Sequence, residues 1–86
     1  MTAKEMFEKL GYVQDINDGN FISYYRQPKK GCDERITFDK TDGGFVVFSP
    51  SELDDFEDCS LYIFPKELQA INKQVEELGW NKWKTY

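Results

Sequence analysis

Two short segments rich in Asp and Gly, each between two β-prone runs, constrain this chain of 86 residues more than any other feature. The turn segments and their flanking runs are 17–20 between 12–16 and 21–25, and 42–44 between 35–39 and 45–48. An Asp-Gly pair supplies the positive φ angles that tight hairpin turns require. The sequence therefore predicts two β-hairpins joined by a basic loop at residues 28–32, with residues 61–63 as a candidate fifth strand.

A helix is predicted near each end of the chain. Thr2 and Glu5 fit a capping box at the start of the first helix, which should end near Leu10. The second helix begins at Pro65, because proline suits the first turn of a helix. Its apolar residues recur at spacings of three and four: Leu68, Ile71, Val75 and Leu78. Both helices run into Leu-Gly followed by an aromatic residue, which predicts closure by a left-handed glycine.

This order of elements predicts one α+β domain spanning residues 1–86. A chain of this length buries only about 60 to 65 % of its unfolded surface, so a second core is not expected. Seven Phe, five Tyr and two Trp should supply much of the single core. We expect an antiparallel sheet of four or five strands with the N-terminal and C-terminal helices packed on one face, in the order α-β-β-β-β-(β)-α.

The net charge of −5 is concentrated in residues 51–58. The acidic residues of this segment are Glu52, Asp54, Asp55, Glu57 and Asp58. An EF-hand calcium loop does not fit, because a loop that starts at Asp55 would have Ser60 in its sixth position and Lys66 in its twelfth. A looser divalent-cation site at Asp54, Asp55 and Asp58 stays open as an alternative, but we expect no metal and no cofactor.

Catalysis is not expected either. The chain has no histidine, which is the commonest general base, and it lacks Gly-rich phosphate loops and the G-x-S-x-G motif. Paired carboxylates act as acid and base where burial or like-charge crowding moves one pKa toward neutrality, and nothing in the sequence supplies an apolar pocket. A divalent-metal or nucleotide-handling enzyme remains the alternative from a different functional class.

Two interpretations of the acidic segment remain. It can be a solvated loop whose charge keeps an aromatic-rich protein soluble and prevents edge-to-edge pairing of neighbouring strands. It can also be a binding surface whose carboxylates imitate phosphates and enter a basic groove on a nucleic-acid-binding protein. The first interpretation predicts no site, and the second predicts an acidic inhibitor of such a protein.

Residues 80–86 interleave aromatic and basic side chains. These side chains are Trp80, Trp83, Tyr86, Lys82 and Lys84. The composition suits a stacking platform for single-stranded nucleic acid, but the same spacing suits packing against the helix end or the sheet. The net charge of −5 opposes direct nucleic-acid binding, because attraction to phosphates supplies nearly all non-specific affinity. Trp80 and Trp83, together with the five acidic residues, are therefore the candidate partner-binding residues.

Cys32 and Cys59 form no CxxC motif and have no histidine partner, so thiolate-metal sites and Cys/His nucleophiles are not expected. We expect both to be reduced thiols, with a single disulfide as the alternative.

The first residues lack a secretory signal pattern and no apolar run is long enough for a membrane span, so the expected location is the cytoplasm. The apolar stripe of the last helix spans barely two heptads, which is too short to predict a coiled coil, and this favours a monomer over a dimer.

Residues 67–80 and 6–12 resemble small uncharacterised proteins encoded by phages and prophage-like elements of Gram-positive bacteria. The resemblance is limited to the two terminal helices, and it brings no catalytic motif and no functional residues. It implies a bacterial cytoplasm and a mobile genetic element. Such elements often encode small acidic proteins that bind and inhibit host machinery, including nucleic-acid-guided defence. The combined prediction is a small acidic, non-catalytic protein that binds a host or phage protein.

Overall fold

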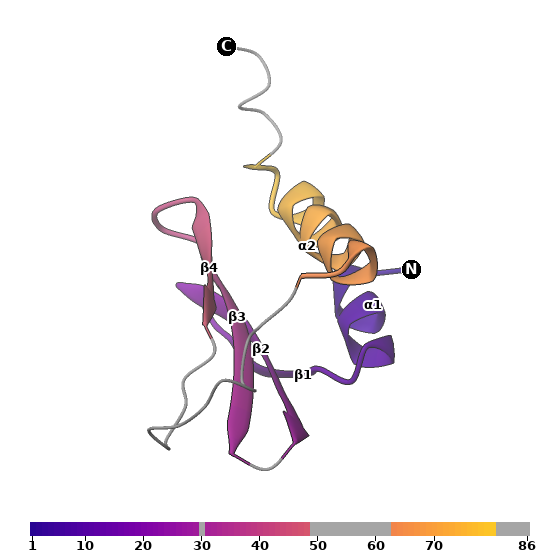
Figure 1. The fold of residues 1–86 in the computed structure, drawn as a ribbon. Helices are drawn as coiled ribbons and strands as arrows, with labels where there is room; N and C mark the ends of the chain where they lie inside the picture. The colour runs from indigo at the N-terminus through magenta and orange to yellow at the C-terminus, as the bar shows by residue number, and fades with distance from the viewer. Residues whose placement is uncertain (30, 49–62, 81–86) are drawn as a thin grey trace.

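The computed structural model describes residues 1–29, 31–48 and 63–80. The elements are α1 (Ala3–Lys9), β1 (Val13–Asn17), β2 (Phe21–Lys29), β3 (Cys32–Asp39), β4 (Gly44–Phe48) and α2 (Pro65–Glu77). The four strands form one antiparallel sheet in the order β1-β2-β3-β4, and both helices lie on the same side of it (Figure 1). The predicted α+β fold is confirmed. Within the described ranges, no helix is long and apolar enough to cross a membrane.

The two predicted hairpins are present, but the predicted basic loop between them is wrong. Strand β2 continues to Lys29 and β3 begins at Cys32, so these two residues pair across the ladder. The register shifts between Arg26 and Lys29. Pro28 lies within this shift, and a proline in a strand requires such an irregularity because it has no N–H to donate. Of the candidate fifth strand, residues 61 and 62 fall outside the described residues, and Ile63 is not part of a strand.

The predicted capping of α1 is confirmed at both ends. The Glu5 backbone N–H donates to Thr2 Oγ1 at 3.2 Å, and the Thr2 N–H donates to Glu5 Oε1 at 2.8 Å. At the other end Gly11 has a φ of 92°, and the Tyr12 N–H donates to the Phe7 carbonyl at 3.0 Å. This is a Schellman closure, and it brings the Tyr12 ring edge-on to Phe7 with centroids 5.5 Å apart.

The hydrophobic core lies between the helices and one face of the sheet. Its buried members are Phe7, Tyr12, Ile22, Tyr24, Ile36, Phe38, Ala70 and Ile71. Aromatic rings supply much of it, as predicted, and the Phe7 ring stacks on Tyr24 with centroids 4.0 Å apart. The two helices are also joined to each other, because the Ala3 N–H donates to Glu77 Oε2 at 2.8 Å. A carboxylate at the N-terminus of α1 also interacts favourably with the helix dipole.

The buried face of α2 differs from the predicted stripe. Ile71 is in the core as expected, but Leu68 is half exposed, while Glu67 and Gln74 are buried. These polar residues have partners on β2: the Tyr24 hydroxyl donates to Gln74 Oε1, and an Arg26 guanidinium nitrogen lies 3.8 Å from Glu67 Oε1. Buried polar groups require such partners, which a hydrophobicity pattern does not reveal. The helix is therefore rotated so that Leu68 lies at the border of the core.

Cys32 is disulfide-bonded, so the expectation of a reduced thiol is wrong for this residue. It is buried at the start of β3. The only other cysteine in the sequence, Cys59, lies outside the described residues. A disulfide requires two Cα atoms about 4.4 to 6.8 Å apart, and a separation along the chain does not tell whether folding brings them that close.

Candidate functional site

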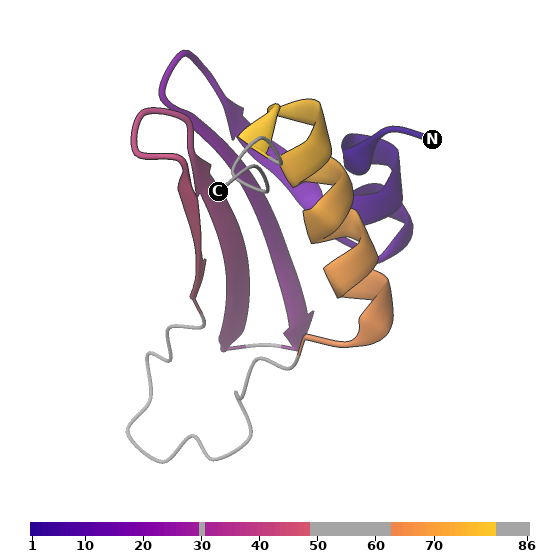
Figure 2. The same cartoon turned by 90° about the horizontal axis from the view of Figure 1, so that it is seen from above.

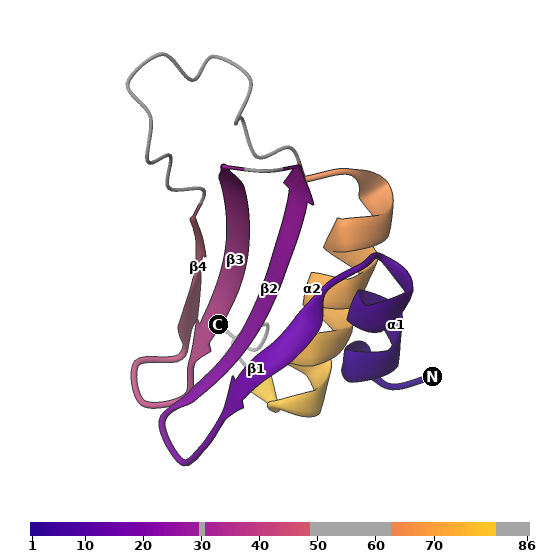
Figure 3. The same ribbon diagram turned by 90° about the horizontal axis from the view of Figure 1, so that it is seen from below.

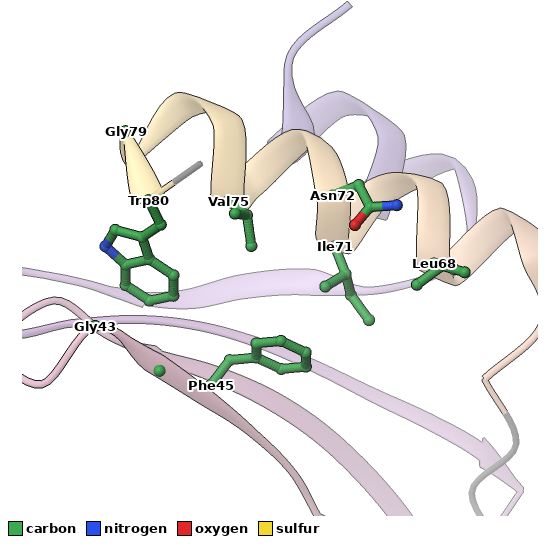
Figure 4. Close-up of a pocket in the computed structure, with 9 residues that line it drawn as sticks. Gly43, Phe45, Leu68, Ile71, Asn72, Val75, Gly79 and Trp80 are labelled. Atoms are coloured by element: carbon green, nitrogen blue, oxygen red, sulfur yellow. The ribbon is translucent and has the colours of Figure 1, made fainter. Parts of the chain in front are cut away.

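An apolar groove runs between α2 and the end of the β3–β4 hairpin, with a volume of about 640 Å³. The nine lining residues are Gly43, Gly44, Phe45, Leu68, Ile71, Asn72, Val75, Gly79 and Trp80. In Figure 4 the Phe45 ring rises from the strand, and Ile71, Val75 and Trp80 point down from α2 on the opposite side. This groove is the candidate functional site.

Strand alternation places Phe45 in the groove. Phe45 pairs with Phe38, whose side chain is buried on the helix side of the sheet, so both rings project toward the helices. Their centroids are 5.5 Å apart. Phe45 nevertheless stays 47 % exposed, because α1 and α2 lie toward the β1 side of the sheet and β4 forms its opposite edge (Figures 2 and 3). A large aromatic side chain thus rests on the core without a covering layer among the described residues.

The α2 side of the groove is a row of residues on the helix, followed by Gly79 just beyond its end: Leu68, Ile71, Asn72 and Val75. Leu68 is 50 % exposed at one end of this row. At the other end Gly79, with a φ of 78°, turns the chain so that Trp80 lies over Phe38 with ring centroids 6.1 Å apart. The left-handed glycine predicted at the end of this helix is confirmed, and it fixes one end of the groove.

The lining of the groove is apolar and carries no ionisable side chain. The nine lining residues themselves therefore offer no general acid, general base or nucleophile. The Asn72 amide and the Trp80 indole are its polar side-chain groups. Apolar walls with few polar groups are typical of sites that bury an apolar ligand, and a volume of about 640 Å³ lies within the usual range.

A buried charged cluster lies apart from the groove, where β2, β3 and the start of α2 meet. Arg26 donates from Nε to Glu34 Oε1 at 2.8 Å and from a terminal nitrogen to the Leu10 carbonyl at 2.8 Å. Its guanidinium also lies 4.3 Å from the centroid of the Tyr12 ring. The arginine thereby joins the end of α1 to the sheet and, through Glu67, to α2. We assign this cluster a role in folding, because each of its charges faces an opposite charge within the protein.

Tyr12 is the unusual member of this cluster. Its side chain is 1 % exposed, and its hydroxyl has no hydrogen-bond partner among the described residues. Burial raises the pKa of Tyr12 to about 12.

Within residues 1–29, 31–48 and 63–80, no group of three or more Asp, Glu, Cys or His side chains is arranged to hold a metal ion.

The second face of the sheet carries exposed apolar residues around a polar centre. Arg35 pairs with Asp15 at 2.7 Å and donates to Ser23 Oγ at 2.8 Å, and it lies 5.2 Å from the centroid of the Tyr25 ring. Phe48 is 56 % exposed and projects to this face, because it is an odd number of positions from Phe45 along β4. The side chains of the two phenylalanines of β4 therefore project from opposite faces of the sheet.

The structure describes the position of only one of the predicted partner-binding residues, and their role in binding stays a prediction. Trp80 lies in the groove, whereas Glu52, Asp54, Asp55, Glu57, Asp58 and Trp83 lie outside the described residues. The prediction missed Phe45, Leu68 and Asn72. A sequence signal existed for the strand side alone: the apolar run 45–48 ends the last of the four predicted hairpin strands before the acidic segment. Leu68 belonged to the predicted core stripe, and nothing in the pattern singled out Asn72.

Comparison of the chain with protein-family models, with curated proteins and with solved structures found no match. A function can therefore be proposed from the geometry of the groove alone.

Proposed function

We propose that this protein is a non-catalytic interaction module that binds an apolar segment of a partner protein in the groove between α2 and β4. The observation that carries the proposal is the pair of half-exposed side chains, Phe45 and Leu68, that face the groove from opposite sides. Large apolar side chains gathered around a concave site favour contact with an apolar partner, because that contact removes their surface from water.

The physical properties of the groove favour a protein as the ligand. Aromatic residues such as Phe45 and Trp80 are typical anchors of protein interfaces, since each can bury a large area in a fixed geometry. A small polar metabolite would need several convergent polar groups, and the groove has few of them. The net charge of −5 opposes nucleic acid as the ligand. In the mobile-element setting that the helix resemblance implies, the partner would be a protein of the host or of the phage.

The test is selection of a random short-peptide library on the immobilised protein, run in parallel on variants Phe45→Thr and Phe48→Thr. The two substitutions remove the same side chain from the same strand, but only Phe45 lines the groove. Threonine is compatible with a strand, so both variants should fold. Thermal melting followed by circular dichroism checks this directly.

We expect enrichment of peptides with several large apolar residues on the wild type and on Phe48→Thr, and loss of that enrichment on Phe45→Thr. The same enriched sequences on all three proteins would place the binding surface elsewhere and refute the proposed function. Enrichment lost only on Phe48→Thr would likewise contradict it, because it would assign binding to the opposite face of the sheet.

A further inference from the structure

We infer that the second face of the sheet, which points away from the helices, is the interface of a homodimer in which two copies pack sheet against sheet. This inference goes beyond the proposed function, because it concerns the opposite side of the sheet from the groove. The expectation of a monomer concerned a coiled coil of the last helix, which is a different surface.

The second face exposes more apolar surface than the outer face of an antiparallel sheet usually does. Its large apolar residues and their exposed fractions are Val13 (61 %), Ile16 (39 %), Phe21 (39 %), Val46 (56 %) and Phe48 (56 %). A sheet that packs helices on one side normally has polar residues on the other. Both helices lie on the opposite side (Figure 3), so neither of them covers these residues.

The strand register arranges this face in two rows that cross all four strands. The first row contains Val13, Tyr25, Arg35 and Phe48, and the second contains Ile16, Ser23, Thr37 and Val46. Paired residues of antiparallel strands project to the same face, and Phe21, two positions before Ser23, projects there as well. Each row thus has apolar residues on the edge strands β1 and β4 and its hydrogen-bonding side chains on the central strands.

This arrangement is self-complementary. In a twofold dimer the same surface meets itself, so apolar positions must fall on apolar positions and polar positions on polar ones. A twofold axis that lies in the interface and runs perpendicular to the strands places β1 over the partner's β1 and β4 over the partner's β4. The apolar edges then meet each other, and so do the polar centres. A second copy therefore fits this face without any further requirement on its pattern.

The polar centre can be covered without leaving a charge unpaired. Arg35 pairs with Asp15 at 2.7 Å and donates to Ser23 Oγ at 2.8 Å. The hydroxyl groups of Ser23 and Thr37 lie 3.1 Å apart. Burial of a charge is strongly unfavourable when its partner is missing, and here each copy already supplies both partners.

A shallow hollow of about 280 Å³ lies beside the second row, and Phe21, Gly44 and Val46 are among the residues that line it. A cavity of about 150 Å³ is enough to hold benzene, so an aromatic ring fits this hollow. In the twofold arrangement the end of β4 that carries Phe48 lies over the start of the partner's β4, where Gly44 borders the hollow. Each Phe48 ring can therefore enter the hollow of the other copy.

The size of the face agrees with a specific dimer. The exposed parts of its five large apolar residues amount to roughly 400 Å², which is the size of the largest patches on soluble proteins, and such patches are often functional. Two copies would cover about 800 Å² of apolar surface, and because homodimer interfaces are about 65 % apolar, the whole interface would bury about 1,200 Å². This value is at the lower end of the range for specific interfaces, about 1,200 to 2,000 Å².

Analytical ultracentrifugation of the wild type and of three lysine variants tests the inference. Val13→Lys and Val46→Lys add a charge at opposite edges of the second face, and Leu68→Lys adds the same charge on α2 as a control. All three side chains are at least half exposed, so the variants should fold, and thermal melting followed by circular dichroism checks this.

We expect the wild type to form a concentration-dependent dimer that Val13→Lys and Val46→Lys each weaken at least about tenfold. Phe48→Thr should also weaken the dimer, because it removes the ring that enters the hollow. Leu68→Lys should dimerise like the wild type. The library selection on Phe45→Thr tests the groove separately, so the failure of one proposal is distinguishable from the failure of the other.

Three results would overturn the inference. A wild type that stays monomeric up to about 1 mM forms no specific dimer. A dimer weakened by Val46→Lys but not by Val13→Lys would be joined edge to edge through β4. A dimer weakened by Leu68→Lys and not by the other lysine variants would use the helix side of the sheet.

Discussion

The hydroxyl groups of Tyr12 and Tyr24 offer a matched pair of substitutions with opposite expected effects. Both rings are fully buried in the same core and both contact Phe7. The Tyr24 hydroxyl donates to Gln74 Oε1 and accepts from Gln14 Nε2 at 3.1 Å, whereas the Tyr12 hydroxyl has no partner in the part of the chain that the structure describes. Replacement by phenylalanine keeps each ring and removes only its hydroxyl.

The magnitudes follow from the hydrogen bonding. A buried polar group without a partner costs about 1 to 3 kcal/mol, so Tyr12→Phe should raise the free energy of unfolding by about 1 kcal/mol. Tyr24→Phe removes both hydrogen bonds and leaves Gln74, which is 3 % exposed, with an unpaired amide oxygen. It should lower the free energy of unfolding by about 2 kcal/mol.

Urea denaturation followed by circular dichroism measures both changes. An unchanged slope of the unfolding free energy against urea concentration would show that the compactness of the folded and unfolded states is preserved.

The dependence of stability on alkaline pH is a second measurement. Unfolded tyrosine ionises near pH 10, whereas burial raises the pKa of Tyr12 in the folded protein to about 12. The unfolded chain therefore loses its proton first, and stability should fall as pH rises from about 10 towards 12.

Tyr12→Phe should reduce this alkaline loss without abolishing it, because burial also raises the pKa of Tyr24. A destabilised Tyr12→Phe variant together with an unchanged alkaline loss would refute the reasoning, since it would show that the hydroxyl is hydrogen-bonded and that its ionisation is not suppressed by folding. A Tyr24→Phe variant as stable as the wild type would refute the assigned role of Gln74.

Two further predictions concern the charged cluster and the cysteine. Arg26→Met should lower the free energy of unfolding by about 3 kcal/mol in urea denaturation, because it leaves the buried carboxylates of Glu34 and Glu67 without their cation. Arg35→Met, whose partner Asp15 is one-third exposed, should cost no more than about 1 kcal/mol, and equal losses would contradict this ranking. In peptide mapping of denatured protein, Cys32 should react with iodoacetamide only after reduction, and labelling before reduction would argue against the disulfide.

Local chemistry explains why much of the fold could be predicted. The capping box of Thr2 and Glu5 and the glycine closures at Gly11 and Gly79 involve residues within a few positions of each other. These interactions form within about one helical turn, so the neighbouring sequence is sufficient to predict them. The turn segments 17–20 and 42–44 are local in the same way, and both hairpins form at them. Gly43 has the expected positive φ of 78°, whereas Gly19 does not have a positive φ, and in the first turn the Asp18 carboxylate instead accepts from the backbone N–H groups of Asn20 and Phe21.

The groove could not be predicted in this way, because it depends on how α2 is rotated over the sheet. That rotation is set by contacts between distant residues: Gln74 with Tyr24, and Glu67 with Arg26. A hydrophobicity pattern counts these polar residues as solvent-facing, and it therefore places Leu68 in the core. The bonded state of Cys32 likewise depends on a distance that only folding defines.

The sequence by itself thus determined the helices, the hairpins and their order, because caps, turns and periodicity act over a few residues. The tertiary structure alone decided which flank of α2 is buried and which borders Phe45. The physical reason is that buried polar side chains must find hydrogen-bond partners, and these partners lie on strands far away in the sequence. Satisfying Glu67 and Gln74 inside the protein leaves Leu68 at the edge of the groove, where a partner can reach it.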